Sequence, residues 1–196
     1  MAREIIDNGT VAGDNTGEIL FDAFAKVNNN SEELYNVAGW GTYVDGQTAP
    51  ATQTINTVES VMLVDGLASS SNSDYLPREI RGVSELWDGV DTFTPISIGD
   101  SYDVRITITV TGKTASPNVI DVILDIGVGA GVTIPVAQLQ IPVVSSVPFT
   151  VTGSIPVFCL GTFKTNGGRI FLKTDAGTLT LSTRSVFIKR DYSGNL

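Results

Sequence analysis

Acidic side chains in the middle of the chain are the residues whose spacing comes nearest to a chemical site. Asp88-Gly-Val-Asp91 resembles a calcium corner, and Asp100 and Asp103 offer further oxygen ligands of the kind that calcium prefers. The spacing lacks the alternating acidic positions of a calcium-binding loop. Solvated turn carboxylates are therefore the favoured interpretation. We expect no bound metal or cofactor, and an ion at this corner is the less favoured alternative.

The sequence offers few side chains that could act in catalysis. There is no histidine, which excludes His-assisted serine or cysteine hydrolysis and histidine metal centres. A carboxylate pair for glycoside cleavage could come from any of the 21 acidic residues, because such pairs are defined by separation in space. Asp121 and Asp125, however, share one face of a predicted strand at positions that look open to water, which lack the burial that catalytic carboxylates need. We expect the protein not to be an enzyme.

Two motifs that resemble functional sites have simpler interpretations. Gly127-Val-Gly-Ala-Gly131 contains the glycines of a phosphate loop, but strand-like residues follow it and no Lys-Ser or Lys-Thr does, so a hairpin turn is favoured. Cys159 is the single cysteine, which excludes an intrachain disulfide. Because it lies in the apolar run Ile155-Pro-Val-Phe-Cys-Leu160, we interpret it as a small buried hydrophobe rather than a nucleophile.

Aromatic side chains outside the clear strands are the remaining candidates for binding. Trp40 and Tyr43 lie in a glycine-rich stretch, and Trp87 lies beside the acidic loop. Such rings either pack a linker onto the body or present flat faces to a sugar, and we favour packing. The candidate ligand loops are those that contain Tyr75, Trp87, Asp88 and Asp91.

Composition and charge narrow the class of protein. The chain has 196 residues, 42% of them hydrophobic and 17% charged, which suits one folded body with an appendage. Residues 1–100 hold 16 acidic and 4 basic side chains, against 5 and 8 in residues 101–196, and the net charge is −9. A chain this acidic is repelled by phosphate backbones, so we expect no nucleic-acid partner. With no signal region and no run of ~18 apolar residues, we expect an aqueous compartment and no membrane.

One helix is predicted, over residues 16–36. Thr16 is a suitable N-cap, and the apolar residues follow a helical rhythm. The stripe consists of Leu20, Phe24, Val27 and Leu34, widened by Phe21 and Tyr35. Two interpretations stay open, namely a surface helix packed on its own domain and a helix that associates with copies of itself at a symmetry axis.

From residue 54 onward the hydrophobic pattern has a period of two. It is strongest over residues 101–110, where apolar and polar residues alternate strictly. Further strands are predicted at residues 58–64, 120–126, 132–141, 147–151, 155–163, 169–173 and 179–189. Short strands separated by turn residues, without intervening helices, indicate a mainly β fold, an antiparallel jelly-roll sandwich. Residues 75–95 are predicted to be a long crossing loop or to carry a short helical turn.

The predicted organisation has three parts. Residues 1–36 form an extended arm and helix, residues 37–53 a linker and residues 54–196 the jelly roll. The linker is inferred from Gly39, Gly41, Gly46 and Pro50, which are typical of flexible connections. Near the end of the chain, Lys189 and Arg190 are expected to pair with acidic neighbours.

The N-terminal residues resemble a short module of tailed-bacteriophage virion proteins. That module has an Asn/Asp-Gly-Thr-Gly turn, then Ala-Phe-x-Lys-Val/Ile-Asn, then Asn-Phe-x-Glu-Leu-Tyr. The corresponding stretches are Ala23-Phe-Ala-Lys-Val-Asn28 and Asn30-Ser-Glu-Glu-Leu-Tyr35. The chain departs from the pattern at Asp14-Asn15-Thr16-Gly17 and at Ser31. The resemblance implies attachment to a phage capsid or tail protein through the arm and the helix.

Two later stretches, Leu86-Trp-Asp-Gly89 and Gly99-Asp-Ser-Tyr102, look like parts of the jelly-roll bodies of phage head fibres and tail fibres. Those bodies are similar to tumour-necrosis-factor or C1q heads and are usually homotrimers. The resemblance implies a homotrimeric fibre or capsid-surface decoration on the virion. The alternative is a receptor-binding tail-fibre tip that recognises a host surface glycan or protein. A trimer would also bury outward apolar residues such as Val119 and Ile123.

Overall fold

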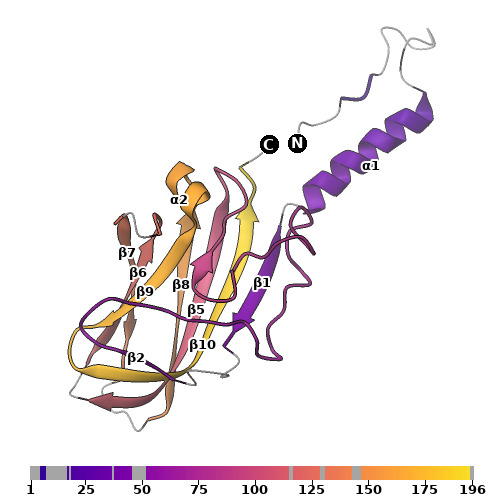
Figure 1. Ribbon diagram of the computed structural model, residues 1–196. Helices are drawn as coiled ribbons and strands as arrows, with labels where there is room; N and C mark the ends of the chain where they lie inside the picture. Colours follow the sequence, from indigo (N-terminus) through magenta and orange to yellow (C-terminus); the bar gives the residue numbers. More distant parts are fainter. Residues whose placement is uncertain are drawn as a thin grey trace.

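Two antiparallel sheets face each other in the computed structural model, and one helix extends from their end (Figure 1). The structure describes residues 5–7, 17, 19–36, 38–45, 52–114, 117–128, 131–142 and 147–194. Within these residues the elements are, in order, α1 Leu20–Asn36, β1 Gly39–Val44, β2 Gln53–Ile55, β3 Ser60–Val61, β4 Thr92–Phe93, β5 Ser101–Thr114, β6 Val119–Asp125, β7 Thr133–Gln140, β8 Phe149–Phe158, α2 Gly161–Asn166, β9 Gly168–Thr174 and β10 Thr178–Tyr192.

The strand order is that of a jelly roll. One sheet has the order β1-β10-β5-β8, with β2 also paired to β10, and the other has β3-β9-β6-β7, with β4 also paired to β9. Early strands therefore pair with late ones, from β1 with β10 inward to β6 with β7, and successive pairs alternate between the two sheets. A long hairpin rolled into two sheets produces this arrangement. The predicted fold class is confirmed.

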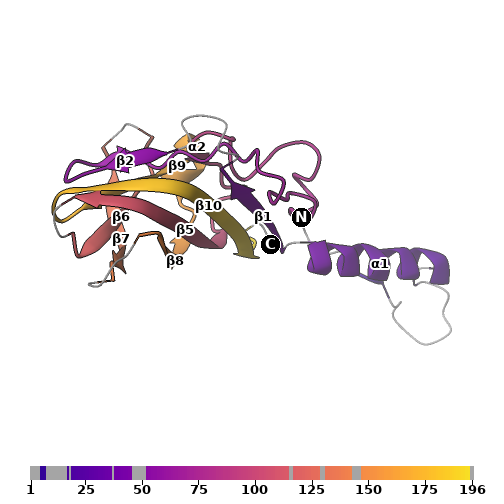
Figure 2. The ribbon, with the colours of Figure 1, turned by 90° about the horizontal axis from the view of Figure 1, so that it is seen from below.

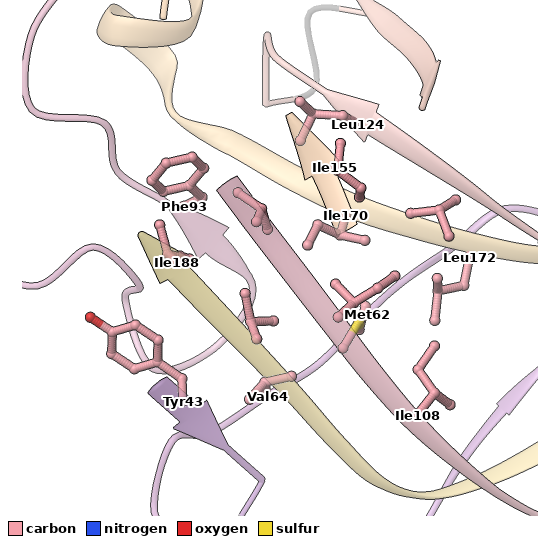
Figure 3. Close-up of a cluster of buried hydrophobic side chains, with 14 of the residues drawn as sticks. Tyr43, Met62, Val64, Phe93, Ile108, Leu124, Ile155, Ile170, Leu172 and Ile188 are labelled. Atoms are coloured by element: carbon pink, nitrogen blue, oxygen red, sulfur yellow. The ribbon is translucent and has the colours of Figure 1, made fainter. Parts of the chain in front are cut away.

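The core lies between the two sheets and follows from the alternation of side chains along each strand. Every second residue of β5 is buried, and β10 and β9 show the same alternation. Figure 3 shows Ile108 of β5 and Ile188 of β10 gathered with Ile170 and Leu172 of β9. These side chains are almost completely buried, and such burial stabilises the fold by roughly 1.5–3 kcal/mol for each large aliphatic side chain.

The predicted linker over residues 37–53 is wrong at its centre. Gly39–Val44 form strand β1, which pairs with the end of β10 from Gly39 opposite Arg190 to Val44 opposite Ser185. Gly39 allows close approach rather than flexibility, since a Cβ there would lie 2.3 Å from the backbone nitrogen of Pro77. Gly39 and Gly41 have no side chain, so the period of two in this strand is hidden in the sequence. The sandwich therefore begins at Gly39 and not at residue 54.

Strand boundaries near β8 also differ from the prediction. The strands predicted over residues 147–151 and 155–163 are one continuous strand, β8, because Gly153 stays paired with Ile106 instead of breaking the ladder. The chain then leaves the sheet and forms the short helix α2, whose Phe163 enters the core. At residues 58–64 the paired strand is limited to Ser60 and Val61. Three-dimensional packing, and not local propensity, decides these boundaries.

The crossing segment contains the helical turn that was one of the two expectations for residues 75–95. The amide of Ile80 donates to the carbonyl of Pro77 at 3.0 Å, and the amide of Ser84 donates to that of Ile80 at 2.9 Å. Just before this turn, the amide of Trp40 donates to the carbonyl of Tyr75 at 2.8 Å. The crossing segment is thereby fixed to the outer edge of β1.

Helix α1 extends away from the sandwich in both ribbon views (Figures 1 and 2). It confirms the helix predicted over residues 16–36, although the expected N-cap, Thr16, lies outside the described residues. Phe24 is 57% exposed and Val27 is 43% exposed, so packing of the helix on its own domain is wrong for these two side chains. The side chains of Leu20, Phe21, Leu34 and Tyr35 lie outside the described part of the chain.

Two side chains expected on the outer face of β6 are buried instead. Ile123 is only 4% exposed within a single chain, so it needs no partner subunit to cover it, whereas Val119 is half-buried. Asp125 is also buried, and its Oδ1 accepts the amide of Gly127 at 2.9 Å. The pairing of β6 with β9 is regular throughout, so the faces of β6 still alternate, and the irregularity between Val122 and Ile123 in the pairing with β7 adds Val136 on β7.

Candidate functional site

The clearest hollow in the described part of the chain is a groove of about 460 Å³ beside β1. Its walls are Thr42 and Tyr43 of β1 and two stretches of the crossing loops, within residues 65–73 and 85–89. The loops reach this position because the amide of Thr42 donates to the carbonyl of Asn72 at 2.8 Å, and the amide of Asn72 donates back at the same distance. The groove is therefore built from segments far apart in the sequence.

Two aromatic side chains form the floor of the groove. Tyr43 is buried, and its hydroxyl donates to Oε2 of Glu85 at 2.9 Å and accepts the amide of Leu86 at 3.1 Å. Burial, and then the bond to the Glu85 carboxylate, raise the pKa of Tyr43, so its hydroxyl stays protonated. Trp87 is almost completely buried, and its Nε1 donates to the carbonyl of Val64 at 2.9 Å. The floor is thus held by hydrogen bonds on both rings.

Three carboxylates, those of Asp65, Glu85 and Asp88, line the groove. Oδ1 of Asp88 accepts the amides of Val90, Asp91 and Thr92 at 2.8–2.9 Å. Partial burial opposes ionisation of Asp88, but these donors outweigh it, and its pKa lies below the ordinary value. None of the described lining residues is lysine or arginine, although the buried Arg184 interacts electrostatically with Asp65. The carboxylates of Glu85 and Asp88 in the lining disfavour anions.

Both loop turns of the groove use the same local chemistry. Oδ1 of Asp65 accepts the amide of Leu67 at 2.9 Å, two residues further on, just as Asp88 accepts the amide of Val90. A glycine with positive φ follows each aspartate, with φ of 69° at Gly66 and 78° at Gly89. Asp-Gly is a turn sequence because the carboxylate bonds to its own backbone and the glycine takes the left-handed conformation. This repeated pair was the sequence signal that could have located the groove.

The structure brings together some of the predicted ligand residues but not all of them. Trp87 and Asp88 line the groove, although the Trp87 ring is packed inside rather than presented to solvent. Tyr75 is 55% exposed and stacks on Trp40 with ring centroids 4.9 Å apart. Asp91 is turned away, because its Oδ1 accepts from Nε of Arg169 at 3.1 Å. Sequence analysis missed Asp65, Leu67 and Glu85 as groove residues.

Other reactive groups are held inside the fold. Cys159 is completely buried, as expected, and burial, followed by the nearby charge of Asp100, raises the pKa of its thiol to about 11. In the described ranges no three His, Cys, Asp or Glu side chains are grouped so that they could hold a metal ion. The described residues also contain no helix long and apolar enough to span a membrane.

A buried ionic cluster secures the end of the sandwich from which α1 leaves. Nη2 of Arg190 donates to Oδ1 of Asp100 at 2.9 Å and to the hydroxyl of Ser193 at 2.6 Å, and Nη1 contacts Glu79. The expectation that Arg190 pairs with acidic neighbours is confirmed, and Lys189 likewise lies 2.7 Å from Asp191. Both carboxylate oxygens of Asp100 accept hydrogen bonds within the cluster, whereas Nε of Arg190 is buried with no partner among the described residues, and we assign the cluster to stability rather than to chemistry.

Comparisons with known proteins reach only distant structural likenesses. No protein-family model matches the sequence, and no curated protein matches it. Among solved structures, Eiger TNF from S. frugiperda is similar at 10% identity and a TM-score of 0.49, over 81% of this chain and 96% of that one. PRD1 vertex protein P5 is similar at 16% identity and a TM-score of 0.47, over 80% of this chain and 73% of that one. At these TM-scores neither likeness adds to what the strand order shows.

Proposed function

We propose that this chain is a non-enzymatic structural protein of a tailed-phage virion, a homotrimeric fibre or capsid-surface decoration held by its N-terminal region. The observation that supports it most is helix α1, which extends from the sandwich with Phe24 and Val27 exposed. These two side chains belong to the stretch that resembles the virion module, Ala23-Phe-Ala-Lys-Val-Asn28.

Helix α1 needs packing to be stable. Even alanine-rich helices shorter than about 12–15 residues are marginal in water, and most helical stability in proteins comes from packing of an apolar face. Helix α1 has 17 residues and contains three consecutive asparagines, Asn28 to Asn30, which are weak helix formers. A partner that covers Phe24 and Val27 would supply the missing packing. In the proposal this partner is the capsid or tail protein.

The sandwich itself offers surfaces for association of three copies. Strands β7 and β8 end their respective sheets, and Ile134 and Phe158 on these strands are exposed. Exposed apolar residues on edge strands favour pairing with another chain. Permanent interfaces commonly bury upward of ~2,000 Å², and such an interface would stabilise the protein without disulfides.

The test combines light scattering with loading onto particles. The full-length protein is expected to have a mass near three times 20.7 kDa that persists on dilution. The double variant Phe24→Glu/Val27→Glu should keep this mass and no longer load onto particles. Ala25→Glu, which adds a charge about 100° further round the helix, serves as the control and should load normally. Normal loading of the double variant contradicts the assigned anchor, and a stable monomer contradicts the trimer.

Receptor binding is the second candidate function, and the groove beside β1 is the observation that favours it. An exposed decoration can also adhere to a host surface, so the two functions are compatible. The measurement is adsorption of the labelled full-length protein to a panel of bacterial strains. We expect saturable adsorption to at least one strain, and its absence from every strain removes this candidate.

A further inference from the structure

We propose that the groove beside β1 binds a saccharide without acidic groups, with one sugar ring packed on Tyr75 and the next held in the groove. This inference rests on the second candidate function, adhesion to a host surface. It names the place of binding and the class of ligand.

The exposed aromatic stack is continuous with the groove. Trp40 and Thr42 are two residues apart on β1 and therefore point to the same side, about 7 Å from each other. The crossing segment runs antiparallel beside them, because the amide of Trp40 donates to the carbonyl of Tyr75 and the amide of Thr42 donates to that of Asn72. One face of the Tyr75 ring is covered by Trp40, yet the side chain is 55% exposed. A ring bound on Tyr75 thus lies directly beside the groove that Thr42 and Asn72 line.

The chemistry of the lining selects a ligand rich in hydroxyl groups. Short hydroxyl and amide side chains, those of Ser69, Ser71, Asn72 and Ser73, line the groove together with the carboxylates of Glu85 and Asp88, and the Ser71 hydroxyl also bonds to the backbone of Val44. Carboxylates accept hydrogen bonds and serine and asparagine both donate and accept, which matches sugar hydroxyls that also do both. Leu67 adds an apolar contact because it is 70% exposed in the wall of the groove. Aromatic and apolar contacts with a few convergent polar groups are typical of small-ligand sites.

The charge of the lining excludes acidic sugars. The carboxylates of Glu85 and Asp88 line the groove with no lysine or arginine among the described lining residues, whereas Asp65 also interacts with the buried Arg184. A uronate, sialate or phosphate group in the groove would face the like charges of Glu85 and Asp88, which weakens its binding. Uncharged sugars and amino sugars meet no such repulsion.

A peptide is the less favoured occupant. Peptides commonly bind by adding a strand to an exposed sheet edge. The free edge of β1 is already used here, because the amides of Trp40 and Thr42 bond to the crossing segment. The groove therefore presents side chains to a ligand and lacks a row of free backbone donors. Such a surface suits a sugar better than an extended peptide.

The experiment is a glycan array probed with the labelled full-length protein, with neutral, amino and acidic glycans on the same surface. Wild type is expected to bind at least one glycan without acidic groups and none that carries uronate, sialate or phosphate. Leu67→Arg fills the groove with a long cationic side chain and should weaken this binding more than about tenfold. Val83→Arg makes the same change at a residue that is 85% exposed and outside the lining, and it should bind as wild type does.

A second pair of variants tests the aromatic contact. Tyr75→Ala removes the ring and should weaken binding about fivefold, while Tyr75→Phe keeps the ring and should retain most of the affinity. Circular dichroism of each variant shows that the sandwich is still folded. The inference is overturned if no glycan free of acidic groups binds, if only acidic glycans bind, or if Leu67→Arg binds as wild type does.

The failure of this inference is distinguishable from that of the adhesion function. If Leu67→Arg adsorbs to bacteria as strongly as wild type does, adhesion stands and the groove is the wrong site. If the adsorption is lost on protease treatment of the cells and not on treatment that oxidises sugars, the receptor is a protein and the saccharide assignment is wrong. If wild type adsorbs to no strain, both fail together.

Discussion

The sandwich and helix α1 bury their apolar residues in different ways. The sandwich encloses its large side chains within one chain, so that Phe93, for example, is almost completely buried between Tyr102 and Phe163. In α1, Phe24 is 57% exposed. The same residue type is therefore a core residue in one region and an exposed one in the other. The sandwich therefore has its own packed core, and the exposed apolar residues of the helix are the ones to which our proposal assigns an interaction outside the chain.

The largest expected effect compares these two phenylalanines directly. The Phe93 ring makes edge contacts with Tyr102 and Phe163, with ring centroids 4.9 Å and 5.2 Å away. Phe93→Ala removes this ring and should lower the free energy of unfolding by about 4 kcal/mol. Phe24→Ala should change it by less than about 0.5 kcal/mol. Urea denaturation followed by tryptophan fluorescence measures both. A large loss in Phe24→Ala would show that α1 packs on the sandwich in solution.

The next effect tests the end of the sandwich from which the helix leaves. Asp100→Ala leaves the Arg190 guanidinium buried without its partner and also removes the bonds to Ser97 and Gly194, so we expect a loss of about 3 kcal/mol. Asp191→Ala breaks only the half-exposed pair with Lys189 and should cost less than about 1 kcal/mol. Equal losses in the same denaturation assay would mean that the buried cluster is not what secures this end.

The junction between helix and sandwich gives a smaller effect. Gly39→Ala places a methyl group against the backbone of Pro77 and should cost about 2 kcal/mol, because either β1 or the crossing segment must move. Gly161→Ala is the matched control, since nothing lies within 4 Å of its added Cβ and it begins a helix. If Gly39→Ala leaves the thermal unfolding temperature unchanged, the close packing of Gly39 on Pro77 is contradicted and residues 37–53 are better described as a linker.

The smallest effect concerns the pH dependence of the interior. The pKa of the Cys159 thiol is raised from 9.0 to about 11 in the folded chain, so above pH 9 the unfolded chain ionises this group first. The stability contributed by the neutral thiol is complete below pH 9 and is lost as pH rises towards 11. Between pH 9 and pH 10 the free energy of unfolding of wild type should fall by about 1 kcal/mol more than that of Cys159→Ala. Urea denaturation at each pH measures both, and an equal fall in the two proteins would contradict this.

The candidate groove brings together some of the residues that the sequence singles out and leaves others apart. Tyr75, Trp87 and Asp88 were marked because aromatic and acidic residues outside strands attract attention, and all three lie in the groove or next to it. Glu85 was not marked, because its importance arises from the hydroxyl of Tyr43, 42 residues away in the sequence. Asp91 was marked and lies elsewhere, since Arg169 holds it. No local pattern carries information about these distant partners.

Local periodicity was enough to establish the mainly β sandwich, the alternation along β5 and the helix over residues 20–36, because side-chain direction repeats every two residues in a strand and every 3.6 in a helix. Contacts between distant segments decided the rest. They placed Gly39–Val44 in the sheet, buried Ile123 and formed the groove from three separate stretches. These features depend on which surfaces meet when the chain closes, and pairing energies between distant residues leave no regular spacing in the sequence.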